Sequence, residues 1–202
     1  MSAELLALAD WKRRVLDLYS DVRAASDRAD AWRSWRAGRD ELFAGHPQSP
    51  LPEPERGSFR GLPYFDYDPS ARVLATVRPS EPVTLEIGTS GNGAYRFTRF
   101  GEAAFELAGE ALALELYWLD GYGGGIYLPF ADATSGSTTF GGGRYLLDTV
   151  KGADLGADGE RLVLDFNFAY NPSCAYDPRW VCPLAPPANR LPVEVHAGES
   201  TT

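Results

Sequence analysis

The sequence predicts a mainly β fold, an antiparallel barrel or sandwich of about eight strands that follows an N-terminal helical pair and precedes a proline-rich coil. Apolar and polar residues alternate within residues 112–118 and 162–168, and a period of two is typical of strands with one buried face. Three turn dipeptides lie between such runs: Asn92-Gly93, Asp120-Gly121 and Asp158-Gly159. Because tight turns join neighbouring strands as hairpins, these dipeptides favour an antiparallel sheet. A sheet of this size curls into a barrel or splits into a sandwich.

Residues 4–24 and 30–44 are predicted to form two helices. Their apolar residues recur at intervals of three and four, which is the spacing of an amphipathic helix. The stripe weakens between residues 24 and 30, where Ser26, Asp27 and Asp30 offer N-cap side chains. Since the apolar stripe has to be covered, either the rest of the chain packs on it or a second copy does. A homodimer through these helices is therefore one alternative.

The chain divides into three predicted parts: helices at 1–45, a connector rich in proline and aromatic residues at 46–70, and an antiparallel β domain with a C-terminal coil at 71–199. Proline fixes φ and removes a hydrogen-bond donor, so the connector is expected to be extended and irregular. Its many aromatic residues indicate that it packs on the domain surface instead of forming a free linker.

The charge distribution excludes two classes of partner. The chain has 19 basic and 28 acidic side chains, a net charge of −9, and only two of the basic residues are lysines. A surface of this sign repels nucleic acids and anionic membranes. No apolar run approaches the roughly 20 residues that span a bilayer, and residues 1–4 lack the features of a signal peptide. We therefore expect a cytoplasmic protein that binds neither nucleic acid nor membrane.

The two cysteines, Cys174 and Cys182, have neither the zinc-knuckle nor the redox C-x-x-C spacing. A pair of reduced thiols is the first expectation in a reducing compartment, and a local disulfide is the alternative. A metal site would need His46 and His196, which are far away in the sequence, so no metal is predicted.

Several polar residues of the predicted sheet are candidates for a binding site. Arg144 opens a strand after a triple-glycine run, and Asp165, Asn167 and Glu115 lie on strand faces opposite apolar neighbours. Such side chains either face solvent or converge in a pocket. A second triple-glycine run follows Tyr122, and both runs favour either strand curvature or the close approach of a ligand.

No nucleophile–base motif is present, because the sequence contains neither a G-x-S-x-G elbow nor an H-E-x-x-H helix. A hydrolase or isomerase remains an alternative, with Asp165 or Glu115 as the carboxylate, His46 as the base and Arg144 as the anion stabiliser. No sequence motif supports a flavin or nicotinamide, so the cofactor is left unknown.

A distinctive block at residues 164–176 reads LDFNFAYNPSCAY and continues with Cys182-Pro183-Leu184. Upstream, Pro129 to Gly136 reads PFADATSG, and residues 142–146 read GGRYL. Over about residues 30–199 the chain resembles the prokaryotic domain-of-unknown-function family 1684. The resemblance implies that one set of polar residues belongs to the family pattern: Asp132, Thr134, Arg144, Asp165, Asn167, Tyr170, Asn171, Cys174 and Cys182. These residues either lock the coil onto the sheet or form the floor of a site.

The leading hypothesis is a protein that binds a small organic ligand in, or at the end of, a β-barrel. The predicted ligand-binding residues are Arg144, Asp132, Thr134, Asn167, Tyr170, Asn171, Tyr117 and Tyr122. Further aromatic residues are expected to line the same cavity: Trp118, Phe140 and Tyr145. The alternatives are the enzyme described above and an interaction protein that dimerises through its helices.

Overall fold

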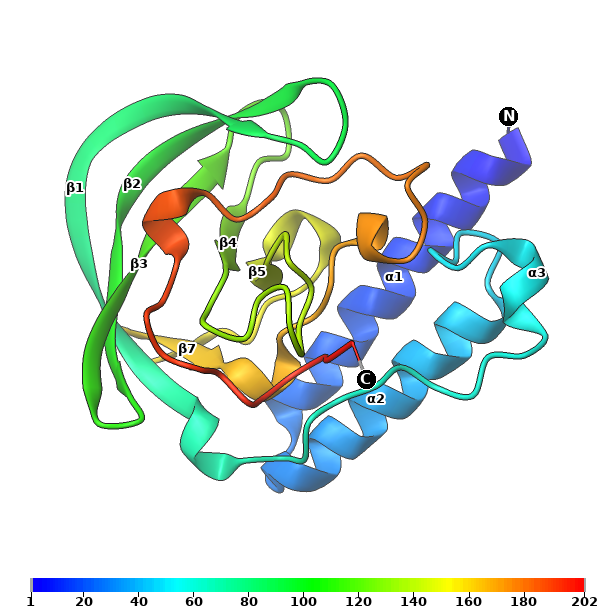
Figure 1. The fold of residues 1–202 in the computed structure, drawn as a ribbon, viewed down its shortest axis with the longest axis horizontal. Coiled ribbons are helices and arrows are strands. Elements are labelled where there is room, and N and C mark those ends of the chain that lie inside the picture. The colour runs from blue at the N-terminus through cyan, green and yellow to red at the C-terminus, as the bar shows by residue number, and fades with distance from the viewer. Residues whose placement is uncertain (1, 202) are drawn as a thin grey trace.

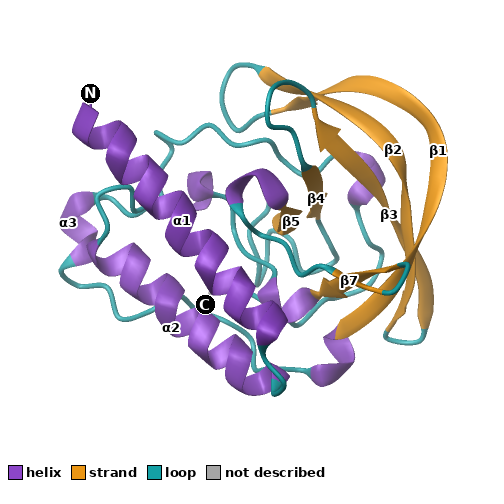
Figure 2. Ribbon diagram, turned by 180° about the vertical axis from the view of Figure 1, so that it is seen from behind, coloured by secondary structure: helices purple, strands orange, loops and turns teal. Residues whose placement is uncertain are grey.

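The computed structural model describes residues 2–201, which form a helical pair packed beside one curved sheet (Figure 1 and Figure 2). The two predicted helices are confirmed: α1 covers Ser2–Ala24 and α2 covers Arg28–Gly45. Asp27 is the N-cap of α2, where its carboxylate accepts a hydrogen bond from the Asp30 amide at 2.9 Å. None of the helices in the described part of the chain is long and apolar enough to cross a membrane.

The connector after α2 runs back along that helix and reaches the coil near the C-terminus. It contains one short α-helix, α3 (Glu53–Arg56), and ends in a 3-10 turn at Pro69–Ala71, with little regular secondary structure elsewhere. The Asp40 carboxylate in α2 accepts a hydrogen bond from the Leu62 amide at 2.9 Å. Tyr64 then pairs through its backbone with Glu199. The connector thus packs on α2 on one side and on the coil on the other.

Seven strands form one sheet in the order β5-β4-β3-β2-β1-β7-β6, and every neighbouring pair is antiparallel. Their bounds are β1 Arg72–Gly88, β2 Ala94–Leu107, β3 Glu110–Leu119, β4 Ile126–Phe130, β5 Arg144–Asp148, β6 Ala157–Asp158 and β7 Arg161–Asp165. Strands β1, β2 and β3 are long and make two consecutive hairpins, so the predicted antiparallel sheet is confirmed.

The predicted barrel or sandwich is wrong, because this sheet stays open. Within residues 2–201, the two edge strands β5 and β6 form no ladder with each other, and β5 meets the chain after β7 only through an isolated bridge between Tyr145 and Tyr170. The sheet stays open because of the chain conformation at the end of β7. There the Asp165 carboxylate accepts a hydrogen bond from the Asn167 amide at 3.1 Å and starts a 3-10 turn at Phe166–Phe168. The strand that alternation predicts through residue 168 therefore ends at residue 165.

The strand count and the fold class also need correction. The described residues form seven strands instead of about eight, and with two long helices the fold is mixed α/β and not mainly β. The tightest reversal, between β2 and β3, uses Ala108 and Gly109, which both have positive φ. Alanine rarely adopts this conformation, so no turn signal marks the position in the sequence.

The main core lies on the inner face of the curved sheet and is covered by the coil at residues 172–200. Phe105, Leu114, Phe130 and Phe166 pack there against three coil residues: Leu191, Val195 and Ala197. Figure 1 shows the coil running inside the curve of the strands. The helices bury their apolar stripe elsewhere, where Trp35 and Tyr19 pack with Val163 and Phe168 beside β7.

Arg144 at the start of β5 holds the coil on the sheet. Its side chain is 1% exposed, and its Nη2 pairs with the Asp132 carboxylate at 2.8 Å. Nη2 also donates to the Val195 carbonyl at 3.0 Å, and Nη1 donates to the carbonyls of Ala197 and Glu199. One guanidinium thus satisfies three coil carbonyls that belong to no sheet ladder.

We predict that Arg144→Met destabilises the fold by about 3–5 kcal/mol, because it leaves the buried Asp132 carboxylate without its cation. The measurement is urea unfolding followed by tryptophan fluorescence. Arg190→Met is the matched control, since Arg190 is exposed, and we expect it to change the free energy of unfolding by less than about 0.5 kcal/mol. Equal effects of the two substitutions would contradict the role given to Arg144.

Candidate functional site

Three of the predicted ligand-binding residues form an ion pair and hydrogen bonds with one another inside the core. The Asp132 carboxylate binds Arg144 through one oxygen, and its other oxygen accepts from the Thr134 amide at 2.7 Å and from the Thr134 hydroxyl. All three side chains are buried. Their polar atoms therefore serve the coil and the turn after β4, and none of the three lines the large cavity described below.

Asp165 and Asn167 hold the end of the connector against β7. The Asn167 side chain donates to the Asp68 carbonyl at 2.7 Å and accepts from the Asp68 amide at 2.9 Å. It also donates to the Asp165 carboxylate at 2.8 Å. Burial raises the pKa of Asp165 above its ordinary value, although the hydrogen bonds from Asn167 oppose that shift.

Glu115 and His46, the other two candidates for acid–base chemistry, have local partners. Glu115 accepts from the Tyr117 hydroxyl at 2.6 Å and pairs with Arg99 at 2.9 Å. His46 Nε2 lies 3.3 Å from the Asp10 carboxylate, and its Nδ1 accepts from a backbone amide. No hydrogen bond or ion pair between described residues joins Glu115, His46 and Asp165. Tyr122 is fully exposed in the loop between β3 and β4.

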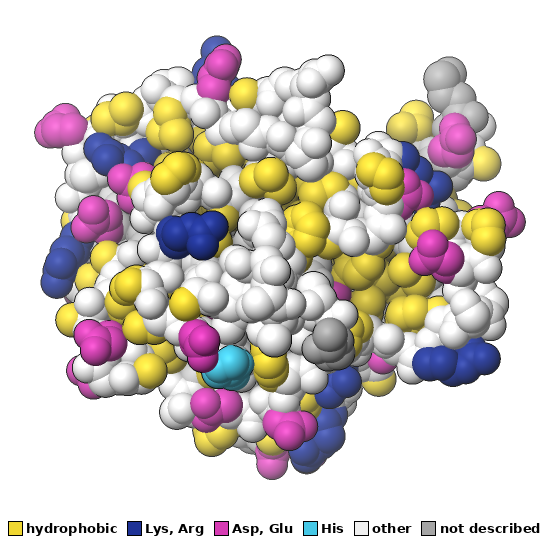
Figure 3. Space-filling view, viewed as in Figure 1, with side chains coloured by type: hydrophobic (Ala, Val, Ile, Leu, Met, Phe, Trp, Pro, Cys, Tyr) yellow, Lys and Arg dark blue, Asp and Glu magenta, His cyan; other side chains and the backbone are white. Residues whose placement is uncertain are grey.

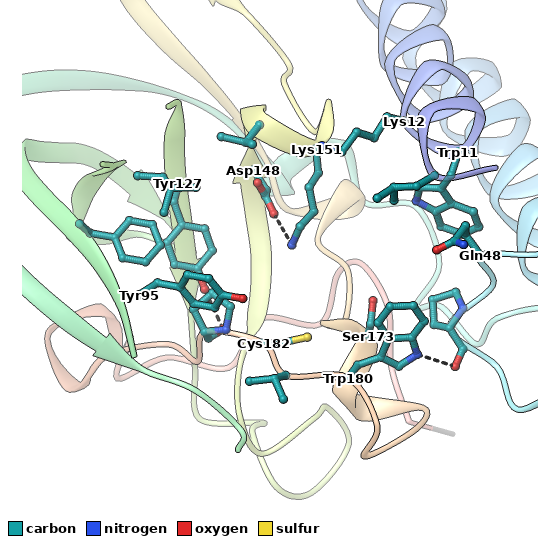
Figure 4. A pocket seen from close by; sticks show the side chains of 17 residues that line it. Trp11, Lys12, Gln48, Tyr95, Tyr127, Asp148, Lys151, Ser173, Trp180 and Cys182 are labelled. Carbon is teal, nitrogen blue, oxygen red and sulfur yellow. Dashed lines mark hydrogen bonds and ion pairs between the residues drawn. The ribbon is translucent and has the colours of Figure 1, made fainter. Parts of the chain in front are cut away.

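The site with the strongest claim to function is a cavity of about 300 Å³ between the helical side and the sheet, which we call the outer cavity. Five parts of the chain line it: α1, residues 48–50, the strands β2–β4, residues 148–151 and residues 173–183. Figure 4 shows Trp11, Lys12 and Gln48 on the helical side and Tyr95 and Tyr127 on the sheet side. Figure 3 shows hydrophobic side chains gathered in a hollow beside the helical pair.

Five aromatic residues contribute to the wall of the outer cavity: Trp11, Tyr95, Phe97, Tyr127 and Trp180. The Trp180 indole donates to the Pro50 carbonyl at 3.2 Å and so joins the coil to the connector. Tyr127 and Tyr145 both donate to the Pro183 carbonyl, which fixes the chain next to Cys182. The wall is therefore held by hydrogen bonds at several points, and the cavity is largely preformed.

The charges in the outer cavity come from Lys12, Lys151 and Asp148. Lys151 Nζ pairs with the Asp148 carboxylate at 3.0 Å. Burial lowers the pKa of Lys151, but the Asp148 carboxylate outweighs it, so the pKa lies above its ordinary value and Lys151 is a cation at neutral pH. Within the described residues Lys12 forms no ion pair, so the two lysines and Asp148 together carry one net positive charge.

A second, smaller cavity of about 70 Å³, the inner cavity, adjoins the outer one. The two share Trp11, Pro50, Lys151 and Ser173 in their linings. The inner cavity has room only for a small functional group or a few waters.

Two of the predicted ligand-binding residues, Tyr170 and Asn171, do line the inner cavity, and so does Tyr145 from the wider predicted set. Asn171 is buried, and its side-chain oxygen has no hydrogen-bond partner among the described residues. A buried acceptor of this kind calls for a donor from water or from a ligand.

Arg39 is a second cation of the inner cavity beside Lys151. Its guanidinium carbon lies 5.0 Å from the ring centre of Trp35 and 5.0 Å from that of Tyr170. Its Nε donates to the Tyr64 hydroxyl at 2.8 Å, and its Nη2 pairs with the Glu199 carboxylate at 2.9 Å. The inner cavity thus meets the contacts that tie α2, the connector and the coil together.

Glu199 is completely buried, and burial raises its pKa to about 7 although Arg39 and the Asn171 amide favour the charged form. Its carboxylate accepts hydrogen bonds from the Asn171 amide at 3.0 Å and from the Tyr176 hydroxyl. Glu199 therefore changes its protonation near neutral pH at the place where the helices meet the coil.

Sequence reasoning missed most of the outer cavity. Its chemical groups come from Trp11, Lys12, Lys151 and Trp180, which belong to no local motif, and from Cys182, which the sequence placed in the family pattern without a binding role. One signal was present: the chain has only two lysines, and both line this cavity. Across residues 2–201 no group of three or more His, Cys, Asp or Glu side chains is arranged to hold a metal ion.

The comparisons with known proteins give a family and a solved relative. The sequence model of the family described as "Protein of unknown function (DUF1684)" matches residues 57–200. The solution NMR structure of an uncharacterized protein from Haloarcula marismortui is similar to this chain at 38% sequence identity with a TM-score of 0.61. The match covers 84% of this chain and 91% of that one. No curated protein matches the chain. The family match confirms the resemblance stated from the sequence.

We predict that the stability of this protein falls between pH 5 and pH 8 in a way that depends on Glu199. Because the pKa of Glu199 is raised to about 7 in the folded state, its contribution is fully present below its unfolded pKa of about 4.3 and is lost as the pH rises through about 7. Relative to Glu199→Gln, the wild type should lose roughly 2–3 kcal/mol of unfolding free energy over this range.

Urea unfolding of both proteins at several pH values measures this difference. Glu194→Gln is the matched control, because Glu194 is exposed on the same coil, and its curve should run parallel to that of the wild type. A constant difference between wild type and Glu199→Gln at all pH values would contradict the raised pKa.

Proposed function

We propose that this chain, which belongs to the DUF1684 family of proteins of unknown function, binds a small organic anion with an aromatic or aliphatic body in the outer cavity. The observation that carries the proposal is the position of the lysines. A chain with a net charge of −9 has two lysines, and both line the same preformed, largely apolar cavity. The binding place differs from the barrel interior that the sequence predicts, because the sheet is open.

The anionic part of the ligand follows from the charges. Asp148 neutralises one cation by its 3.0 Å contact with Lys151, which leaves the charge of Lys12 for a ligand. An acidic surface around a basic cavity repels anions at long range, so the attraction acts at contact distance. A carboxylate or sulfonate suits two ammonium groups, which donate as point charges without the planar fork of arginine.

The apolar part of the ligand follows from the walls. Trp11, Tyr95 and Trp180 present ring faces and edges to the outer cavity, and Leu8 and Val181 add aliphatic surface. A volume of about 300 Å³ lies at the lower end of the range for small-molecule sites. The ligand is therefore compact, about the size of a substituted ring system.

The enzyme alternative has less support. Among residues 2–201, the only carboxylate that lines the outer cavity is Asp148, which pairs with Lys151, and neither histidine lines it. General acid–base chemistry needs a group within reach of the substrate whose proton is free to move. Dimerisation through the helices stays a prediction, for which the exposed Leu5, Leu6 and Leu16 on α1 leave apolar surface.

The test uses two fluorescent probes that differ in one charged group: anilinonaphthalenesulfonate, which is an anion, and phenylnaphthylamine, which lacks the sulfonate. We expect the wild type to bind the sulfonate more tightly. Lys12→Met should weaken its binding about threefold to tenfold, the size of one charge-assisted contact at a partly exposed site. Its affinity for phenylnaphthylamine should not fall, because methionine keeps the apolar stem.

Arg13→Met is the matched control, because it removes one positive charge from the next position of α1. Arg13 pairs with Asp10, its side chain is 67% exposed, and it does not line the outer cavity. It should leave both affinities unchanged. If the two probes bind equally, or if Arg13→Met and Lys12→Met have the same effect, the lysines of the cavity do not select an anion and the proposal is overturned.

A further inference from the structure

Two residues that line the inner cavity have buried polar atoms without a hydrogen-bond partner. They are Tyr19 on α1 and Asn171 in the chain after β7. Tyr19 is 2% exposed and Asn171 is 5% exposed. The Tyr19 hydroxyl oxygen and Asn171 Oδ1 form no hydrogen bond with any described residue. Because nearly all buried polar groups in folded proteins are hydrogen-bonded, the inner cavity suits a guest that supplies both missing partners.

Arg39 links these two side chains. Its guanidinium carbon lies 5.0 Å from the ring centre of Trp35, and the Trp35 and Tyr19 ring centres are 5.8 Å apart. Arg39 also pairs with Glu199, whose carboxylate accepts from the Asn171 amide at 3.0 Å. Tyr19, Arg39 and Asn171 all line the same cavity of about 70 Å³. A cavity of this size holds one small group, so the three side chains surround a single guest.

Of the two unpartnered atoms, one belongs to a donor and the other is an acceptor. Burial raises the pKa of Tyr19 above its ordinary value, so its hydroxyl keeps its proton at neutral pH. The neighbouring indole N–H of Trp35 can donate only to the hydroxyl oxygen, which leaves the O–H proton without an acceptor. The Asn171 amide nitrogen donates to the Ser200 carbonyl at 3.4 Å, which assigns the unpartnered atom as the oxygen. The guest therefore has to accept from Tyr19 and donate to Asn171.

The cations of the inner cavity do not require a further anion. Arg39 Nη2 pairs with the Glu199 carboxylate at 2.9 Å, and Lys151 Nζ pairs with the Asp148 carboxylate at 3.0 Å. Both pairs are neutral when the carboxylates are ionised. An uncharged group that donates and accepts hydrogen bonds therefore fits the inner cavity, and a hydroxyl or a primary amide has both properties.

The inner cavity is placed to receive such a group from a ligand in the outer cavity. The two cavities share Trp11, Pro50, Lys151 and Ser173 in their linings. A volume of about 70 Å³ is too small for a ring system, so only an end group of the ligand enters.

We propose that the inner cavity binds a hydroxyl or primary amide group of the ligand, with Tyr19 donating to that group and Asn171 accepting from it. This inference rests on the proposed function, because the body of the same ligand occupies the outer cavity. An end group without hydrogen-bonding atoms leaves both buried polar atoms unsatisfied when it displaces water from them. The inner cavity therefore selects against such ligands.

The test measures how well naphthalenesulfonate and its derivatives displace anilinonaphthalenesulfonate from the full-length protein. The derivatives carry one hydroxyl group on the ring without the sulfonate, or a methyl group at the same position. Measurements at about pH 8 keep Glu199 ionised, since its pKa is about 7. We expect at least one hydroxyl isomer to bind about threefold to tenfold more tightly than the parent compound, the size of one or two net hydrogen bonds. Its methyl counterpart should show no such gain.

Tyr19→Phe removes only the hydroxyl group. It should weaken binding of that hydroxyl isomer at least about threefold and leave the affinity of the parent compound unchanged. Because the hydroxyl has no partner in the fold, the variant should keep a urea midpoint at or above that of the wild type. Tyr67→Phe is the matched control, since Tyr67 packs against the same core cluster and lines neither cavity. It should change neither affinity.

Four results would overturn the proposal. They are no hydroxyl isomer that binds more tightly than both the parent and its methyl counterpart, a gain that survives Tyr19→Phe, an equal loss in Tyr67→Phe, and a lower urea midpoint for Tyr19→Phe. None of them touches the proposed function as long as the parent compound binds and Lys12→Met weakens that binding. If neither the parent nor any derivative displaces the probe, the proposed function fails, and the assignment of the inner cavity fails with it.

Discussion

The buried ion pair between Arg144 and Asp132 is the contact on which the arrangement of this fold depends. Because the sheet is open, another part of the chain has to cover its inner face. Here that part is a coil with few regular backbone hydrogen bonds of its own. The guanidinium satisfies the carbonyls of Val195, Ala197 and Glu199, and Asp132 balances its charge. Arginine suits this task because its rigid fork reaches several acceptors at once, while its weak hydration lowers the cost of burial.

The same stretch of coil is held from the opposite side by the helices. Glu199 pairs through its backbone with Tyr64 and through its carboxylate with Arg39 of α2. Residues 195–200 therefore lie between two anchors, one on the sheet and one on the helical pair. Beyond these anchors the helices and the sheet separate, and the outer and inner cavities occupy that space. Fold and candidate site thus share one origin: the cavity exists because the helices are tied to the sheet at one end of their interface.

Local sequence patterns predicted the helices and most strands well. They did not predict how these elements pack together. The spacing of apolar residues and the Asp27 cap located both helices, because these signals act within a few residues. β7 ends early because of the side-chain conformation of Asp165, and the turn at Ala108 depends on the backbone conformation of that residue. The alternation of apolar and polar residues along a strand predicts neither conformation. The sequence marked Arg144 as a polar residue on a strand. It does not distinguish an arginine that holds the fold together from one that binds a ligand. The outer cavity was missed because its walls come from five distant parts of the chain, so no single stretch of sequence contains it.

The order of these elements along the chain has a consequence for synthesis. All seven strands precede residues 195–199, so on the ribosome the sheet emerges before the segment that covers its inner face. Until that segment follows, the nascent chain exposes the apolar surface of Phe105, Leu114 and Phe130 to solvent or to a chaperone. The pairing of β1 with β7 joins residues as distant as Arg72 and Asp165, and pairing between distant residues slows folding. The fold is therefore complete only once residues 195–199 have been synthesised and their carbonyls have bound the guanidinium of Arg144.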